Sequence, residues 1–149
     1  MPSAACDGIV DYQVILDLLP MGACIIDREL RVCAWNLALV EWTGISREGI
    51  LEKRLTEYFP RLASWCFRDR LAQVFDQGTP AIFSAAFHKY FIAVEVKTGA
   101  YSGHMLQQTV VRPLDPQREK AFILIQDVTT QFLQMEELRE RRSDCRVSR

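Results

Sequence analysis

The chain has 149 residues, of which 49% are hydrophobic and 25% are charged, and this balance is that of a globular protein rather than a disordered or fibrous one. Its length suits a single domain. The formal net charge of −1, from 18 basic and 19 acidic residues, gives no basis for binding a nucleic acid or an anionic membrane surface.

The N-terminal segment, residues 1–10 (MPSAACDGIV), lacks the basic region and the apolar stretch of a signal peptide. No apolar run approaches the roughly 20 residues of a membrane helix. We therefore expect a cytoplasmic protein with no membrane segment and a disordered N-terminus. The scattered cysteines show no CxxC or zinc-type spacing, which predicts reduced thiols and no metal site. They are Cys6, Cys24, Cys33, Cys66 and Cys145.

A short helix is predicted over residues 11–19 (DYQVILDLL), with Asp11 as its N-cap and Pro20 as its stop. Helical spacing puts four apolar residues on one face. These residues are Val14, Ile15, Leu18 and Leu19.

The next segment, GACIIDRELRVCAW, predicts a β-hairpin. Its first run is apolar, and a polar turn follows from Asp27 to Glu29. Apolar side chains then alternate over residues 30–35, which is the period of a half-buried strand.

A helix is predicted between Asn36 and Gly44. An asparagine directly after a strand is a favoured N-cap because its side-chain oxygen accepts from free N–H groups of the first turn. Glycine is the usual residue just after a helix. The intervening LALVEWT carries one charge, so most sides of this helix must be covered. Beyond it, ISREGILEKRLTEYFPRL predicts short helical turns with Ser46 and Thr56 as caps.

A longer amphipathic helix is predicted over residues 64–77, ending at Gly78 and Pro80. Its apolar residues recur at helical spacing, so this helix should cover a sheet. They are Phe67, Leu71, Val74 and Phe75.

Three strands are predicted in the last third, at residues 81–91, 104–114 and 121–128. A final helix follows Asp127, with a Glu137–Arg141 pair on one side. The order of elements separates helices from strands and indicates an α+β fold with one antiparallel sheet.

The stretch WNLALVEWTGISREGILEKRLTEYFP resembles the PAS domain family of bacterial sensory modules. The resemblance lies in Trp35–Asn36 at the end of a strand, Trp42–Thr43–Gly44 at the end of a helix, and the turn LTEYFP at residues 55–60. Asp127–Val128–Thr129 is similar to the D-(I/V)-T junction by which PAS domains pass signals to downstream effectors.

This resemblance covers residues 11–142. It implies a PAS-like domain over residues 11–128, with a five-stranded antiparallel sheet, helices on one face, and flanking N- and C-terminal helices. Residues 129–149 would form a signalling helix and tail. The chain departs from the family pattern by an insertion over residues 88–105, between the third and fourth strands.

The family fold implies a cavity between the sheet and the helices. The alternative is that the same side chains simply fill this space. The candidate pocket residues are Trp42, Trp65, Cys66, Phe67, Leu71, Phe83, Phe87, Gln107, Thr109 and Gln126.

Haem and flavin are not expected. A haem-binding PAS domain uses a histidine on the helix before the third strand, and residues 61–79 contain none. His88 is expected in a strand and His104 in a turn. Flavin photochemistry needs a cysteine within a longer motif, and the flanking asparagine, arginine and glutamine of that motif are absent around Cys66.

A small cysteine-dependent enzyme is a further alternative. It would pair Cys66 as nucleophile with His88 as base, oriented by Glu95 or Asp127. The sequence has no nucleophile elbow, phosphate loop or metal set to support it. We therefore expect a module that binds and does not catalyse.

The resemblance implies the input module of a histidine kinase, as in two-component systems, or of a diguanylate cyclase. Such a sensor would bind a small apolar ligand or a partner and relay a conformational change through Asp127, Val128 and Thr129 to the last helix. The competing hypothesis is a ligand-free PAS-fold dimerisation scaffold.

The two terminal helices are too short to be stable alone, so each must dock on the domain or on a second copy. This predicts a homodimer. The apolar stripe of the last helix consists of Phe132, Met135 and Leu138.

Overall fold

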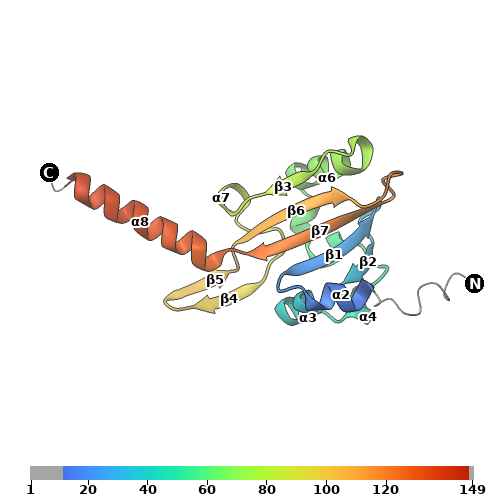
Figure 1. Cartoon of the computed structure of the whole chain (residues 1–149), viewed down its shortest axis with the longest axis horizontal. Helices are drawn as coiled ribbons and strands as arrows, with labels where there is room; N and C mark the ends of the chain where they lie inside the picture. The colour runs from blue at the N-terminus through green and yellow to red at the C-terminus, as the bar shows by residue number, and fades with distance from the viewer. Residues whose placement is uncertain (1–11, 148–149) are drawn as a thin grey trace, which may run out of the picture.

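The computed structural model describes the backbone of residues 12–147 and the side chains of residues 12–143 (Figure 1). The predictions for residues 1–10 and for Asp11 lie outside this part of the chain. The elements, in chain order, are α2 (Tyr12–Leu18), β1 (Gly22–Asp27), β2 (Val32–Trp35), α3 (Leu37–Thr43), α4 (Arg47–Ile50), α5 (Leu55–Tyr58), the 3-10 helix η1 (Pro60–Ala63), α6 (Trp65–Gln77), β3 (Ala81–Phe83), α7 (Ala85–His88), β4 (Glu95–Thr98), β5 (Tyr101–His104), β6 (Gln107–Pro113), β7 (Lys120–Asp127) and α8 (Thr129–Val147).

Five strands form one antiparallel sheet in the order β2-β1-β7-β6-β3, which confirms the predicted fold class. The last strand in the chain, β7, lies at the centre. Cys24 of β1 and Val111 of β6 both pair with Ile123 of β7. The predicted β1–β2 hairpin is present, with a register shift after Ile25.

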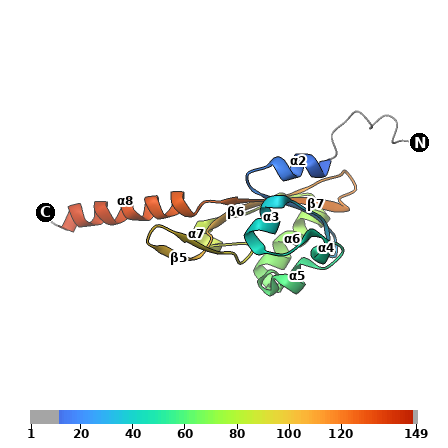
Figure 2. The same ribbon diagram turned by 90° about the horizontal axis from the view of Figure 1, so that it is seen from below.

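Helices α3 to α6 cover one face of the sheet, and α2 lies on the other (Figure 2). The alternation of a strand produces both layers. In β7, Ala121, Ile123 and Ile125 face the main core beneath the helices, whereas Phe122 and Leu124 pack in the small cluster under α2.

The face of α2 that meets the sheet differs from the predicted one. Leu16 is the buried residue of this helix, and Leu19 packs beside it. Val14, Ile15 and Leu18 are exposed, Leu18 to 77%. Apolar residues occur on more than one side of α2, so helical spacing alone did not identify the side that docks.

Helix α3 has the predicted caps. The Asn36 Oδ1 accepts from the Leu39 N–H at 3.2 Å, and Gly44 adopts the left-handed conformation, with φ 73°. Helix α3 also packs directly on Gly22 of β1, where an added Cβ would lie 2.6 Å from Leu39 Cδ2. Glycine therefore allows α3 to approach the sheet closely.

The short helices after α3 follow the prediction in part. Ser46 caps α4, and its Oγ accepts from the Gly49 N–H at 3.0 Å. Thr56 was predicted as a cap, but it lies inside α5, whose N-cap position is Arg54. A main-chain bridge joins Arg54, just before α5, to Arg31, just before β2, and local sequence does not predict such a long-range contact.

Helix α6 matches its prediction closely. Phe67, Leu71, Val74 and Phe75 are its buried residues, and Gly78 ends it with φ 72°. The polar side of the helix faces away from the sheet, as the spacing predicted.

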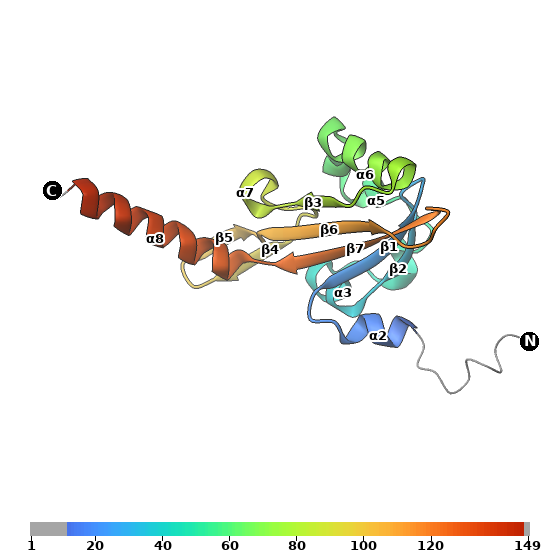
Figure 3. The same cartoon turned by 45° about the horizontal axis from the view of Figure 1, so that its top comes forward.

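The segment after α6 differs most from the prediction. The strand expected over residues 81–91 ends at Phe83 and is followed by α7, so His88 ends a helix. Residues predicted as a loop form the separate hairpin β4–β5, and His104 lies in β5 rather than in a turn. Figure 3 shows α7 and this hairpin next to the point where α8 leaves the sheet.

Helix α8 extends away from the domain (Figure 1). The predicted pair is present, with Arg141 donating to Glu137 at 2.7 Å. No helix in the described part of the chain is both long and apolar enough to cross a membrane.

Candidate functional site

Four rings lie together in the main core beside α6. The Phe67 ring stacks on Phe83 with centroids 5.2 Å apart, and Phe91 lies 5.9 Å from Phe67 and 5.3 Å from Phe83. The His88 imidazole lies 5.4 Å from Phe67 and 5.2 Å from Phe83. The three phenylalanines are each 1% exposed. We call these four residues the aromatic cluster. It fills the space between α6 and β3 with rings.

Arg61 of η1 holds the chain that follows α7. Its guanidinium donates to the main-chain oxygen of Tyr90 at 2.9 Å and to that of His88. The guanidinium carbon also lies 4.1 Å from the Tyr90 ring centroid and 5.2 Å from that of Phe67. Arg61 therefore joins η1 to the main chain on both sides of Lys89.

Arg70 of α6 lies over the other side of the cluster, with its guanidinium carbon 4.7 Å from the Phe83 ring centroid. Burial lowers the pKa of His88 below its usual value, and the positive charges of Arg70 and Arg61 lower it further, although a main-chain hydrogen bond with Ser84 opposes them. The neutral form of His88 is therefore favoured.

Thr109 of β6 lies on the same face of the sheet as Phe83, its cross-strand partner. The residue is fully buried, and its Oγ1 has no hydrogen-bond partner. The Nδ1 atom of His88 is also buried without a partner. Unpaired buried polar atoms are rare, so both atoms mark this region as unusual.

The buried amide of Gln107 ties the aromatic cluster to β6. Its Oε1 accepts from the N–H groups of Phe91 at 2.8 Å and Ile92 at 3.0 Å, and its Nε2 donates to the Ile92 carbonyl at 2.8 Å. Any shift of Phe91 must therefore act on the start of β6.

The neighbouring residue, Leu106, is bonded to the start of α8. Its N–H donates to Thr129 Oγ1 at 2.9 Å, and its carbonyl accepts from the Val128 N–H at 2.8 Å. Thr129 in turn donates from Oγ1 to Asp127 Oδ1 at 2.7 Å. The three residues predicted as the signal relay thus form a hydrogen-bonded junction with Leu106.

The predicted pocket residues do not all meet. Those that reach the main core on the helix side of the sheet are Phe67, Leu71, Phe83, Gln107 and Thr109, with Trp42 half-buried against it. Those that do not are Trp65, which is 78% exposed, Phe87, which is 88% exposed, and the exposed Cys66 and Gln126. The prediction that these four line an interior cavity is wrong.

Each misplaced residue has a structural reason. Phe87 lies on the outer side of α7, a helix where a strand was expected. Trp65 and Cys66 begin α6 on its outward side, before Phe67. Gln126 follows the inward-facing Ile125 in β7, and successive side chains in a strand point to opposite faces.

Sequence reasoning also missed several residues of this site. Phe91 completes the aromatic cluster, and Arg61 and Arg70 bound it, yet none was a candidate. The aromatic run at residues 90–91 was a usable signal for Phe91. The two arginines had no local signal, because their positions depend on η1 and α6 folding against α7.

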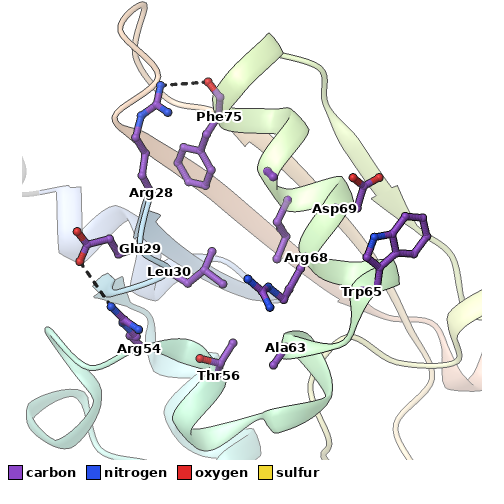
Figure 4. Close-up of a pocket in the computed structure, with 12 residues that line it drawn as sticks. Arg28, Glu29, Leu30, Arg54, Thr56, Ala63, Trp65, Arg68, Asp69 and Phe75 are labelled. Atoms are coloured by element: carbon purple, nitrogen blue, oxygen red, sulfur yellow. Dashed lines mark hydrogen bonds and ion pairs between the residues drawn. The ribbon is translucent and has the colours of Figure 1, made fainter.

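An open groove of about 750 Å³ lies on the other side of α6 (Figure 4). Trp65 lines this groove, together with Arg28, Arg54 and Arg68. No residue of the aromatic cluster lines it. The positive charge of the groove is partly neutralised within the groove itself, because Arg54 lies 3.9 Å from a Glu29 carboxylate oxygen.

The cysteine-dependent enzyme finds no support in the geometry. Cys66 Sγ contacts Ser64 Oγ at 3.5 Å, and no hydrogen bond joins Cys66 to His88. Burial raises the pKa of the Cys24 thiol to about 12 and also raises that of Cys33, which keeps both as unreactive thiols. Among the described side chains, no three histidine, cysteine or acidic residues gather as metal ligands.

The sheet order, the helical cover and the junction at Thr129 define an α+β domain of the sensory type. A family model described as PAS fold matches residues 16–131, and the chain belongs to this family. It is a PAS domain like those found in sensor histidine kinases and receptors. No curated protein shows significant sequence similarity to the chain.

Solved structures with the same fold include three bacterial domains. The photoactive yellow protein domain of the sensor histidine kinase Ppr from Rhodospirillum centenum is 17% identical, with a TM-score of 0.57, and the match covers 83% of this chain and 97% of that one. The PAS domain of nitrogen regulation protein NR(II) from Vibrio parahaemolyticus is 18% identical, with a TM-score of 0.54 and coverage of 79% and 98%. The PAS domain of the quorum-sensing receptor RpfR from Cronobacter turicensis, in complex with BDSF, is 16% identical, with a TM-score of 0.56 and coverage of 74% and 96%.

Proposed function

We propose that this PAS domain is a signal-input module that relays changes in its aromatic cluster to α8, and through α8 to an effector such as a histidine kinase or a diguanylate cyclase. The observation that carries this proposal is the bonded path from Phe91 through Gln107 and Leu106 to Thr129. The stimulus would be a small ligand or a partner that repacks the cluster. The cytoplasmic location expected from the sequence stays a prediction.

The path is suited to relay a movement because few of its groups can shift independently. The Gln107 amide makes three bonds to one short segment, all of them buried. Breaking one of them would leave a buried polar group unpaired, at a cost of about 1–3 kcal/mol. A movement of the cluster is therefore transmitted to β6 and the first turn of α8 rather than absorbed.

Hydrogen exchange of the α8 amides tests this relay without any ligand. Phe91→Leu should change exchange in the first turns of α8, because it alters the packing that Gln107 transmits. In a Thr129→Val background the same change should leave α8 exchange unaltered. Thr130→Val, at the exposed neighbouring position, is the matched control and should keep the response. If Phe91→Leu leaves α8 exchange unchanged in the parent chain, the relay is refuted.

A ligand-free scaffold is the second candidate, and the filled aromatic cluster favours it. The RpfR PAS domain was solved with BDSF, and we extend to this chain only the proposal that a small molecule enters the same fold. Native mass spectrometry and a visible absorbance scan of freshly purified protein separate the two. A bound mass supports the sensor. A bare chain whose α8 exchange never responds to core changes supports the scaffold.

We also propose that the chain forms a homodimer. The outward side of α2 carries the exposed Ile15 and Leu18, and α8 projects with exposed Met135 and Leu138. A helix of this length gains most of its stability from packing its apolar side. A second copy of the chain would supply that packing for both helices.

A further inference from the structure

The open groove on the outer side of α6 has an apolar inner wall and a charged rim. It lies between α6, the turn before β2, and the segment that holds α5 and η1 (Figure 4). The buried Leu71 and Phe75 and the half-buried Leu30 line it from within. Small-molecule sites bury most of their ligand's surface. A groove as open as this one is better suited to a segment of another protein.

Trp65 lies at one side of the groove (Figure 4). It is 78% exposed, although it is among the largest apolar side chains of the domain. Covering an indole ring removes much apolar surface from water and favours association. Tryptophan and arginine are enriched among the residues that contribute most to protein–protein binding, and both types line this groove.

Leu30 is held in a left-handed conformation, with φ 65°. Glycine or asparagine would form this turn at a lower cost than a bulky side chain. The turn is fixed by Asp27, whose Oδ1 accepts from the N–H groups of Glu29 and Arg31 at 2.9 Å each, and by the Leu30 carbonyl, which accepts from the Leu55 N–H at 2.8 Å. Backbone strain is thus kept at a residue that gives the groove an apolar wall, and such strain is typical of functional sites.

The acidic side chains of the groove are already engaged, whereas two of its arginines are not. Glu29 pairs with Arg31 at 2.7 Å, and Asp69 accepts from the next turn of α6 at 3.1 Å. Arg54 approaches Glu29 only to 3.9 Å. Arg68 makes no hydrogen bond or ion pair with another described residue. The binding capacity left over in the groove is therefore cationic.

This free positive charge is concentrated at one place. Figure 4 shows the side chains of Arg54 and Arg68 approaching Thr56 from opposite sides. Arg28, the third arginine of the groove, is engaged elsewhere, because it donates to the Phe75 carbonyl at 3.2 Å. Guanidinium groups bind carboxylates through strong, charge-assisted hydrogen bonds. A matching partner therefore brings carboxylates to this point of the groove.

We propose that the groove is a docking site for an acidic segment of a partner protein. Carboxylates of the segment would bind Arg54 and Arg68, and an apolar side chain would lie between Leu30 and Trp65. This inference goes beyond the proposed relay, because no residue of the aromatic cluster or of the path from Gln107 to Thr129 lines the groove.

Fluorescence anisotropy of labelled peptides mixed with the full chain tests the docking site. The probe is the acidic peptide GEELFEELG, which has an apolar centre. Its twin GKKLFKKLG reverses the charge, and GEESSEESG keeps the charge but lacks the apolar side chains. The first peptide alone should bind, and its affinity should fall as salt is added, because salt screens the exposed arginines.

Two exposed residues of the groove can be changed without altering the core. Arg68→Gln should weaken binding of the acidic peptide by about tenfold, because a hydrogen bond to a charged group is lost. Trp65→Ala should weaken it by about tenfold or more, as truncation of an interface tryptophan commonly does. Arg112→Gln and Phe87→Ala are the matched controls, since both residues are exposed and lie outside the groove, and they should leave binding unchanged.

Several results would overturn the inference. They are no binding of the acidic peptide, equal binding of either twin, and losses from the groove variants no larger than those from their controls. If Trp65→Ala instead lowers the mass of the parent chain in light scattering, a second copy occupies the groove, which also rejects a partner segment. The relay is judged separately, because its exchange test uses no peptide.

Discussion

The charge of the His88 imidazole bears directly on the packing of the core. Its ring contacts Phe67 and Phe83, and two arginines face it. A proton on this ring would place a third positive charge beside Arg61 and Arg70, among apolar side chains. The fold therefore favours the neutral form, and acid should weaken it at this point.

We predict that His88 makes the fold acid-sensitive. Its pKa in the folded chain lies below the ordinary 6.5 that applies when unfolded. As the pH falls through that value, the unfolded chain takes up the proton first, so stability is lost there and levels off below the folded pKa. Thermal melts across this range should show a steeper loss for the parent than for His88→Phe. Since His104 is common to both proteins, equal pH dependence would contradict the prediction.

Asn36 shows how far sequence reasoning reaches at the scale of one residue. Its capping bond to Leu39 was predicted, because it depends on the chain just after a strand. The same amide also accepts from the Ala23 N–H at 3.1 Å and donates to the carbonyls of Leu16 at 2.8 Å and Met21 at 2.9 Å. These three bonds join segments that meet only in the folded chain, so no local pattern predicts them.

At the scale of elements, the C-terminal end of α6 is held by arginines from two turns. Arg118 donates from Nε to the Phe75 carbonyl at 2.7 Å and from a terminal nitrogen to the Asp76 carbonyl at 3.0 Å. Arg28 donates to the same Phe75 carbonyl at 3.2 Å. Positive charge at this end of a helix also opposes the negative end of its dipole.

Arg118→Met should therefore weaken the attachment of α6 to the sheet. Two bonds to last-turn carbonyls are lost while the apolar stem is kept, so the free energy of unfolding should fall by about 1–2 kcal/mol. Denaturant unfolding followed by tryptophan fluorescence measures this loss. Arg112→Met is the matched control, because the Arg112 side chain is exposed and makes no hydrogen bond or ion pair with a described residue. A loss no larger than in the control would disprove the capping role.

Elements with a strong period were predictable, and the insertion was not. Helix α6 repeats its apolar residues over several turns, so local spacing determined it. Strand β7 is a short apolar run next to turn residues, a pattern that favours a buried strand. Residues 81–91 carry an apolar run without a clear period, and such runs fit a strand or a helix equally well. Because these residues were assigned to a strand, Phe87 was wrongly placed in the predicted cavity.

At the scale of the whole molecule, two groups of exposed apolar side chains lie on the terminal helices. One group lies on α2 and the other on α8, which projects from the domain. In Figure 2, α2 covers only part of the outer sheet face, where Phe122 and Leu124 are half-buried. Two copies could cover these surfaces together, as proposed above.

We predict a dimer in size-exclusion chromatography with light scattering. Leu138→Glu should weaken it by tenfold or more, since burying a leucine contributes about 1.5–3 kcal/mol. Leu138 is preferable to Phe132, whose ring also lies 5.1 Å from the Lys89 nitrogen within the same chain. Leu114→Glu, an exposed position between β6 and β7, is the control. A monomeric parent, or equal weakening by both variants, would rule out this interface.

The central position of β7 bears on how the chain is made. On a ribosome the N-terminal strands emerge first, yet β1 and β6 both need β7 between them to complete their hydrogen bonds. Strands β1 and β7 lie far apart along the chain, and such partners meet slowly. A nascent chain stalled before Lys120 would hold two unjoined half-sheets with open inner edges, which are the surfaces most prone to aggregate and to recruit chaperones.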